Sequence, residues 1–261
     1  MRSYLINLSR RADRLAAMTA QFAALGLTFT RVEAVDARGT PDSAIEKWFT
    51  ATGPLGLLPK GDKCCTLSHR RAWEALVASG ESHAAIFEDD VVLTPQAALL
   101  LGDASWVAPD IGLVKLEQYG PPSQRVLVGE SNEVRAGFQI ARLYSRHTGA
   151  AAYVISRGAA QMLLGGVERY SLPVDHLLFN PNNSPVFAGL APWQMIPAIA
   201  KQQQFVGEKS DIEGWRTGMR RLGWTFIRRE TIRAGYELRL VPSQAWSLIR
   251  GRTRLIRIGT D

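Results

Sequence analysis

Short apolar runs and amphipathic stretches alternate along the first two thirds of the chain. Residues 3–8 form an apolar run that is typical of a buried strand. Residues 10–25 carry apolar side chains at spacings of three and four, which predicts an amphipathic helix. The same spacing predicts a helix over residues 66–79, which lies between expected strands at 29–35 and 83–87.

The second half of this region continues the alternation. Residues 112–117 and 150–156 have the composition of strands, and residues 158–164 have that of a helix. Residues 40–63 are rich in Gly and Pro and predict an irregular segment with one short helix. Repeated strand and helix units predict an α/β fold, with a mixed, mostly parallel sheet flanked by helices. In such sheets, ligands bind beyond the carboxyl ends of the strands.

Three consecutive carboxylates, Glu88, Asp89 and Asp90, interrupt the apolar residues 86–93. Buried negative charge is costly unless a cation compensates it. Carboxylate oxygens suit hard ions such as Mn²⁺ or Mg²⁺, which take their remaining ligands from water and substrate phosphates. A solvated acidic turn is the alternative reading of any isolated acidic triplet.

Polar side chains at the other expected strand ends favour the metal interpretation. Asn7 and Arg10 follow the first strand, and Asp36 follows the second. This mixture suits a nucleotide whose pyrophosphate is bound to a metal. Neither a P-loop nor a well-placed Gly-x-Gly-x-x-Gly motif is present, so metal and side chains would have to hold the phosphates. We interpret Arg14 as pairing with residues of its own helix.

Composition predicts an ordinary globular protein with ample material for a core. The chain has 261 residues, of which 46% are hydrophobic and 21% are charged. The two cysteines, Cys64 and Cys65, are adjacent, and we interpret them as free thiols in a reducing compartment. Neither a secretory signal nor a membrane-spanning apolar run is visible, so we expect a cytoplasmic protein.

Positive charge is concentrated at the end of the chain. Residues 216–257 contain eleven Arg and no Lys, against Glu230 and Glu237, so this segment carries a charge of +9 and the rest of the chain carries −2, which gives the net charge of +7. Aromatic side chains are interleaved with these arginines. We therefore expect a domain over residues 1–212, followed by a basic helical extension over residues 213–261 that binds an anionic membrane surface. Ion pairs with the main domain are the alternative; nucleic acid is an unlikely partner because no motif for it is present.

Sequence blocks in a fixed order resemble a known family. The blocks are Tyr4-Leu5-Ile6-Asn7-Leu8-Ser9-Arg10-Arg11-Ala12-Asp13-Arg14-Leu15, Val32-Glu33-Ala34-Val35-Asp36-Ala37, Lys63-Cys64-Cys65-Thr66-Leu67-Ser68-His69 followed by Trp73, Ile86-Phe87-Glu88-Asp89-Asp90-Val91, Thr148-Gly149-Ala150-Ala151 with Tyr153-Val154-Ile155-Ser156, and Pro173-Val174-Asp175-His176. With them, residues 4 to about 180 resemble glycosyltransferase family 25, the lipooligosaccharide biosynthesis glycosyltransferases. Cys64 departs from the pattern, because glycine is commoner there.

The resemblance implies a GT-A type, Rossmann-like fold. It also implies transfer of a hexose, most often galactose, from a UDP-sugar to a saccharide acceptor of the lipopolysaccharide core, with inversion. Glu88 and Asp90 would hold Mn²⁺ or Mg²⁺, which would neutralise charge on the leaving diphosphate, and His176 would be a third ligand. Such an acceptor would place the protein peripherally at the inner face of the inner membrane.

Several side chains are candidates for the remaining roles. Asp175 would be the base that takes the proton of the acceptor hydroxyl, and Glu117 is the alternative base. Ser68 and His69, at the expected helix start, would bind phosphate or sugar hydroxyls. The other expected contacts of the nucleotide sugar are Asn7, Arg10, Asp36, Asp89 and Lys115.

Two other functions remain compatible with the residues. One is a sugar-binding or nucleic-acid-binding module without catalysis, in which the acidic cluster is only a loop. The other is a nucleotidyltransferase, which also uses carboxylates and metal on an α/β sheet but consumes a nucleoside triphosphate.

Overall fold

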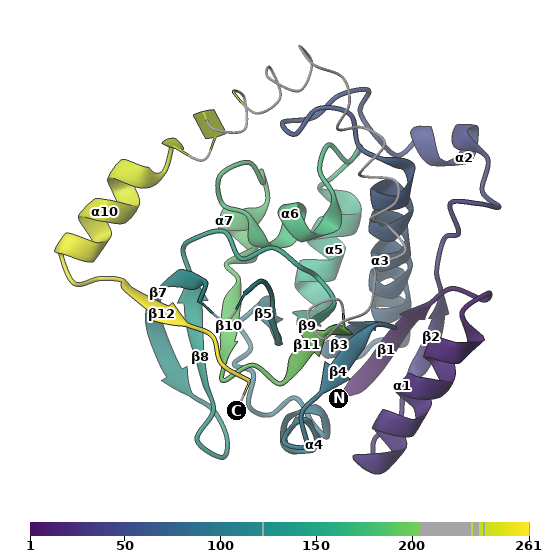
Figure 1. Cartoon of the computed structure of the whole chain (residues 1–261), viewed down its shortest axis with the longest axis horizontal. Coiled ribbons are helices and arrows are strands. Elements are labelled where there is room, and N and C mark those ends of the chain that lie inside the picture. The colour runs from purple at the N-terminus through teal and green to yellow at the C-terminus, as the bar shows by residue number, and fades with distance from the viewer. Residues whose placement is uncertain (122, 204–230, 232–234, 237, 261) are drawn as a thin grey trace.

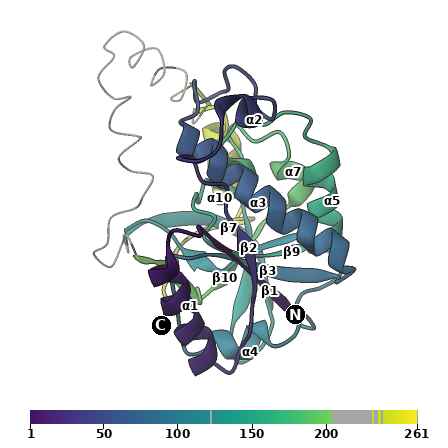
Figure 2. The ribbon, with the colours of Figure 1, turned by 90° about the vertical axis from the view of Figure 1, so that its right-hand side faces the viewer.

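Helices cover both faces of a central sheet (Figures 1 and 2). The computed structural model describes residues 1–121, 123–203, 231, 235–236 and 238–260. The strands are β1 (Arg2–Asn7), β2 (Thr30–Glu33), β3 (His83–Glu88), β4 (Val91–Leu93), β5 (Leu113–Lys115), β6 (Glu117–Gln118), β7 (Arg125–Glu133), β8 (Gln139–Leu143), β9 (Ala152–Ser156), β10 (Trp193–Ile196), β11 (Ala200–Gln202) and β12 (Arg254–Arg257). The helices are α1 (Ala12–Ala24), α2 (Asp42–Glu46), α3 (Lys60–Ser79), α4 (Ala97–Leu101), α5 (Arg157–Gly165), α6 (Val174–Phe179), α7 (Phe187–Leu190) and α10 (Val241–Ile249).

The main sheet has nine strands in the order β12-β7-β8-β10-β5-β9-β3-β1-β2. Parallel pairing joins β2 to β1, β1 to β3, and β5 to β10. The other neighbours are antiparallel. Strand β9 pairs with β3 and β5 on its two sides, β8 pairs with β7 and β10, and β12 pairs with β7. The mixed α/β sheet predicted from the sequence is confirmed, with parallel neighbours less frequent than the alternation of elements predicts.

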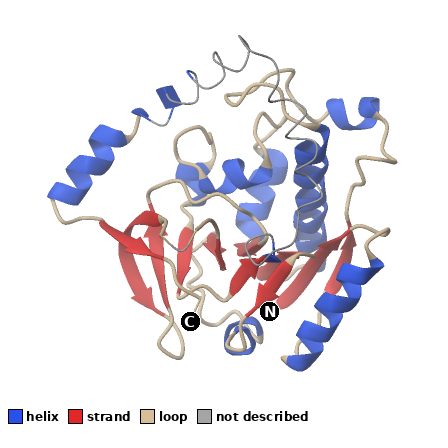
Figure 3. Ribbon diagram, viewed as in Figure 1, coloured by secondary structure: helices blue, strands red, loops and turns tan. Residues whose placement is uncertain are grey.

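Side chains of each strand alternate between two apolar cores. On one face, Tyr4 and Ile6 of β1 belong to the core beneath α3, α5 and α6. On the other face, Leu5 packs with Met18 and Phe22 of α1. Figure 3 shows the two helix layers on opposite sides of the strands. Burial on both faces explains why the central strands are continuous apolar runs.

Helix α3 is longer than the helix predicted over residues 66–79. It begins at Lys60, so Cys64 and Cys65, both free thiols, lie within it. Pro59 precedes the first helical residue, and Asp62 lies in the first turn, where an acid complements the helix dipole. The first turn is also buried from Gly61 to Lys63. Tertiary burial therefore outweighs the Gly- and Pro-rich composition on which the irregular segment was predicted.

The end of the chain returns to the main sheet. Strand β12 pairs antiparallel with β7 at the sheet edge, and α10 precedes it. The expected extension over residues 213–261 thus contributes a strand to the sheet of the expected first domain. Much of that extension, including Trp215, Trp224 and Phe226, lies outside the described residues. Among the described helices, none has the length and apolar composition needed to cross a bilayer.

Candidate active site

A cavity opens where the parallel strands β1, β2 and β3 end. The polypeptide that follows each strand contributes to its wall, and helices α1, α3 and α6 and the loop before β9 supply further lining residues. The predicted site residues that line it are Arg10, Asp36, Ser68, Glu88, Asp89, Asp90 and Asp175. The expectation that the strand ends meet at one edge is therefore confirmed.

Asp90 has an unsatisfied carboxylate in this cavity. Its Oδ1 is buried and has no hydrogen-bond partner in the described part of the chain. Burial, followed by the nearby charge of Glu88, raises the pKa of Asp90 to about 8. The nearest guanidinium, that of Arg14, remains 3.8 Å from the other oxygen, Oδ2. An ionised Asp90 is consequently short of positive charge.

Asp89 is held by protein side chains instead. Asn7 Nδ2 donates a 2.7 Å hydrogen bond to one carboxylate oxygen, and Arg14 Nη1 donates to the other at 3.1 Å. Burial raises the pKa of Asp89, and these two donors oppose the rise. Arg14 thus pairs across elements rather than within its helix, contrary to our interpretation of the sequence. Asn7 is buried and is not among the residues that line the cavity.

Asp36 and Arg10 form an ion pair at the cavity rim. Arg10 Nε lies 3.0 Å from Asp36 Oδ2, and the backbone N–H of Arg38 donates to Oδ1 at 2.9 Å. Burial acts against ionisation of Asp36, but the Arg38 N–H and the Arg10 guanidinium outweigh it and lower its pKa. Arg38 also lines the cavity, so cationic groups face this end of it.

Ser68 and His69 lie in the middle of α3, and their predicted place at a helix start is wrong. The free N–H groups of a helix start are therefore not beside them, because α3 begins at Lys60. Ser68 Oγ accepts from the N–H of Val35 at 2.8 Å and donates to the carbonyl of Cys64 at 2.7 Å. His69 is fully buried and is not among the residues that line the cavity.

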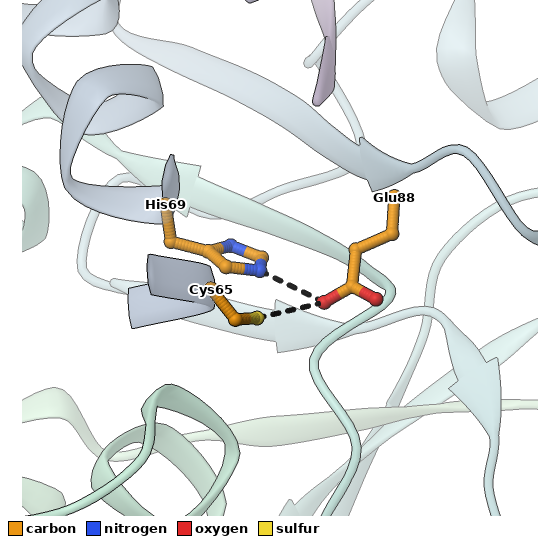
Figure 4. Close-up of side chains that lie close together, drawn as sticks. All are labelled: Cys65, His69 and Glu88. Carbon is orange, nitrogen blue, oxygen red and sulfur yellow. Dashed lines mark hydrogen bonds and ion pairs between the residues drawn. The ribbon is translucent and has the colours of Figure 1, made fainter. Parts of the chain in front are cut away.

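Cys65 and His69 converge on Glu88 (Figure 4). His69 Nε2 is 3.0 Å, and Cys65 Sγ is 3.6 Å, from the same carboxylate oxygen, Oε1. One potential ligand atom from each residue lies within 4.8 Å of the others, and no second group of this kind occurs in the described ranges. Burial, followed by the charge of Glu88, raises the pKa of the Cys65 thiol, so it remains protonated and donates.

Lys115 and Glu117 form a buried pair behind the cavity wall. Both side chains have no exposed surface, and Lys115 Nζ lies 2.7 Å from Glu117 Oε1. Lys115 also donates to the carbonyl of Gly149 and lies 4.6 Å from the centre of the Phe179 ring. Burial lowers the pKa of Lys115 and raises that of Glu117, and each charge opposes the shift of the other. Neither residue is among those that line the cavity.

Gly149 allows the loop before β9 to approach this pair. Its φ of +91° is unfavourable for other residues, and a Cβ would collide with the Tyr119 ring and lie 3.0 Å from Glu117 Oε1. The glycine in the block over residues 148–151 is therefore a requirement of close packing at the cavity.

Asp175 lies in the first turn of α6 and faces the cavity. The start of this helix is fixed to α3, because the N–H of Val174 donates to Thr66 Oγ1 at 3.1 Å. His176, the next residue, contacts the Asn180 side chain through Nδ1 at 2.8 Å and is not among the cavity-lining residues. Its predicted role as a metal ligand remains a prediction.

The carboxylates fit a hard divalent cation better than the Cys65 group does. Asp90 offers a buried oxygen to which no residue placed in the structure hydrogen-bonds, and it shares the cavity with Glu88. Oxygen ligands of this kind suit Mn²⁺ and Mg²⁺. His69 Nε2 and Cys65 Sγ, by contrast, are already engaged with Glu88.

Comparisons with known proteins agree with the sequence blocks. The model of the family described as "Glycosyltransferase family 25 (LPS biosynthesis protein)" matches residues 1–178. The chain is 29% identical over 217 residues to the lacto-N-neotetraose biosynthesis glycosyltransferase LgtB of Neisseria gonorrhoeae, covering 78% of this chain and 75% of LgtB. It is 26% identical to the lipooligosaccharide biosynthesis protein lic2B of Haemophilus influenzae, covering 77% and 76% of the two chains.

The α/β fold and these matches define the protein as a glycosyltransferase. Because the family model covers well over half of the sequence, the chain belongs to glycosyltransferase family 25. All the residues that line the cavity lie within the matched segment except Gln202, and this includes the lining residues of helices α1, α3 and α6.

The raised pKa of Asp90 predicts a pH-dependent stability. With divalent cations removed, Asp90→Asn should be more stable than the wild type. The difference in their free energies of unfolding should grow from about pH 4 to about pH 8. In this window the folded wild type, with a pKa of about 8 for Asp90, retains a proton that the unfolded chain releases, so its stability falls as the pH rises. The difference in the free energy of unfolding should change by up to about 1.4 kcal/mol per pH unit. Urea unfolding in the presence of EDTA measures it.

The exposed carboxylate of Asp110 lies outside the cavity and supplies the control. Asp110→Asn should follow the wild-type curve. Parallel stability curves for Asp90→Asn and wild type across this pH range would show that Asp90 is ionised as readily as an ordinary surface carboxylate.

Proposed function

We propose that the protein transfers a hexose from a UDP-sugar to a saccharide acceptor in a metal-dependent reaction. The observation that carries this proposal is the buried oxygen of Asp90, which has no hydrogen-bond partner among the described residues and lies beside Glu88 in a cavity at the carboxyl ends of three parallel strands. Galactose is the hexose implied by the family resemblance. A lipooligosaccharide or lipopolysaccharide core is the proposed acceptor, in line with the names of the relatives.

Glu88 and Asp90 are the proposed metal ligands, and His176 is the proposed third. The ion, Mn²⁺ or Mg²⁺, would supply Lewis-acid neutralisation of the charge that develops on the leaving UDP. The family assignment and the donor chemistry of the cavity support this role. Asp89 would act on the nucleotide sugar through its neighbours, because Asn7 and Arg14 already hold both of its oxygens.

The nucleotide would bind at the end of the cavity that Asp36 and Arg10 occupy. Asp36 is kept ionised by Arg10 and by the N–H of Arg38, so it can accept hydrogen bonds from ribose or base. Ser68, on the adjacent wall, is a further proposed contact. Lys115 is buried beneath the cavity, so its positive charge would act on the phosphates from behind the wall.

Asp175 is the proposed catalytic base. It would take the proton of the acceptor hydroxyl as that oxygen attacks the anomeric carbon on the side opposite to the leaving UDP, which inverts the configuration. Its place on the cavity wall supports this role. Glu117 is less suited, because it is buried and would first have to leave Lys115.

A GT-A type architecture is proposed for residues 1–212. Its supports are the parallel strands β1 to β3, the acidic turn after β3, and the small sheet β4-β11-β6 that follows this turn. Residues 213–261 are proposed to be the basic extension of this domain.

The extension is proposed to bind the anionic surface of the inner membrane from its cytoplasmic side. Helix α10 has no buried residue, and its Trp246 and Ile249 are 56% and 78% exposed. Arg250 lies 4.5 Å from the centre of the Trp246 ring. Exposed apolar rings beside guanidinium groups suit the headgroup region of an anionic bilayer, and a lipid-linked acceptor would be found there.

Loss of the proposed metal ligands should abolish activity. Glu88→Gln and Asp90→Asn should each lower Mn²⁺-dependent UDP release from a UDP-sugar by at least about 100-fold, because charge on the leaving group is no longer compensated. UDP release is measured over a panel of UDP-galactose, UDP-glucose and UDP-N-acetylglucosamine. The control Glu81→Gln changes a partly exposed carboxylate outside the cavity. Full activity in both cavity variants would remove the metal site from the account.

Asp175→Asn should separate proton transfer from donor binding. Transfer to a saccharide acceptor should fall by about 10²–10⁴-fold, because the general base is lost. The affinity for UDP should stay close to that of the wild type, as measured by isothermal titration calorimetry. An Asp175→Asn enzyme with undiminished transfer would exclude Asp175 as the base and leave Glu117.

Membrane binding should depend on the exposed face of α10. The double variant Trp246→Ser with Ile249→Ser should bind anionic vesicles about tenfold more weakly and keep its UDP affinity. A substitution is preferable to a truncation, since removal of the extension also removes β12 from the sheet. Leu57→Ser, at a leucine that is 60% exposed elsewhere, is the control. Equal vesicle binding by wild type and the double variant would contradict the proposal.

A further inference from the structure

A chain of buried hydrogen bonds runs from the core of the protein to Glu88. Trp73 Nε1 is 2.9 Å from the hydroxyl oxygen of Tyr153, and this oxygen is 2.9 Å from His69 Nδ1. His69 Nε2 is 3.0 Å from Glu88 Oε1. The first three side chains are completely buried, and none of them is among the residues that line the cavity.

The donors and acceptors of this chain fix the direction of each hydrogen bond. The indole N–H of Trp73 can only donate, so the Tyr153 oxygen accepts from it. The hydroxyl hydrogen of Tyr153 then needs an acceptor, and His69 Nδ1 is the one within reach. With Nδ1 accepting, the ring carries its proton on Nε2 and donates it to Glu88.

The opposite tautomer would leave two groups unsatisfied. A proton on Nδ1 would point at the Tyr153 oxygen and leave the buried hydroxyl hydrogen without an acceptor. The bare Nε2 lone pair would also face a carboxylate oxygen at 3.0 Å. An unmade hydrogen bond of a buried group is destabilising, so the tautomer protonated at Nε2 is strongly favoured.

Secondary structure places these groups in line. Cys65, His69 and Trp73 recur every four residues along one face of α3. On the sheet below, Tyr153 of β9 lies opposite Ile86 of β3. Glu88 is two residues beyond Ile86, so its side chain leaves the strand on the same face.

Both protein donors act on the same oxygen of Glu88. Cys65 Sγ and His69 Nε2 converge on Oε1, and the other oxygen, Oε2, points away from them (Figure 4). Glu88 itself lines the cavity. One oxygen of this carboxylate is therefore occupied, and one is left for a ligand.

We propose that Trp73, Tyr153 and His69 form a positioning relay that commits Glu88 to a single ligand oxygen, Oε2. The relay holds Oε1 against α3, so Glu88 would hold a divalent cation through Oε2 alone. This consequence rests on the proposed metal-dependent transfer. The relay residues act through Glu88 and do not touch the substrate.

The tautomer of His69 tests the relay without any metal. The chain has four His residues, so ¹⁵N-histidine labelling of the full-length protein gives a small set of ring signals that single His substitutions assign. The relay predicts a His69 ring protonated at Nε2, with a hydrogen-bonded Nδ1 that loses this bond in Tyr153→Phe. A His69 ring protonated at Nδ1 would overturn the relay.

The affinity for Mn²⁺ tests its effect on Glu88. Tyr153→Phe and His69→Leu should bind Mn²⁺ about 10–100-fold more weakly than the wild type, as measured by electron paramagnetic resonance. Saturating Mn²⁺ should restore kcat in Tyr153→Phe, whereas a general loss of structure would not respond to the ion. His69→Gln keeps an N–H donor and should recover part of the affinity that His69→Leu loses.

Tyr170→Phe is the matched control, because Tyr170 is also a buried tyrosine whose hydroxyl accepts a hydrogen bond, here from Arg70, and it does not line the cavity. It should lower stability without changing the Mn²⁺ affinity. Affinities of Tyr153→Phe and His69→Leu within twofold of the wild type would overturn the relay. A wild type that binds no Mn²⁺ would contradict the proposed function instead, and the His69 tautomer would then decide whether the relay exists.

Discussion

Repulsion among carboxylates at one edge of the sheet is the constraint on which the surrounding structure depends, because neighbouring groups have to compensate these charges. Glu88, Asp89, Asp90 and Asp175 line a single cavity, where burial makes the negative charges of Asp89 and Asp90 costly. The first three follow one another at the end of β3, and the first turn of α6 adds Asp175 to the same cavity. The protein therefore has to supply compensating donors or positive charge to each of them.

The carboxylates are compensated unevenly, and the one that lacks a donor is a proposed ligand of the divalent cation. Asp89 receives donors on both oxygens, Glu88 receives two on one oxygen, and Lys115 lies behind the wall in a pair with Glu117. Asp90 alone among the acidic triplet keeps a buried oxygen without a partner in the described residues, and its pKa is raised to about 8. A divalent cation is the addition that would balance this site.

The strand ends and the acidic cluster were predictable from sequence, because they follow from local periodicity and from the rule that parallel strands end together. Four features were not predictable in this way. The early start of α3 depends on tertiary burial of Gly61 to Lys63, which composition does not reveal. The burial of Lys115 and the pairing of Arg14 with Asp89 depend on contacts between segments distant in sequence. His69 was identified as a site residue, but only the fold shows that it is fully buried and contacts Glu88 without lining the cavity.

Anomalous diffraction is the most direct test of the central claim, that Glu88 and Asp90 hold a catalytic divalent cation. Crystals of the protein grown with UDP and Mn²⁺ would be measured at the manganese absorption edge. The account predicts one strong peak in the cavity, within about 2.0–2.4 Å of oxygens of both Glu88 and Asp90 and of the UDP diphosphate. A bound UDP without such a peak, or a peak on other protein ligands, would contradict it.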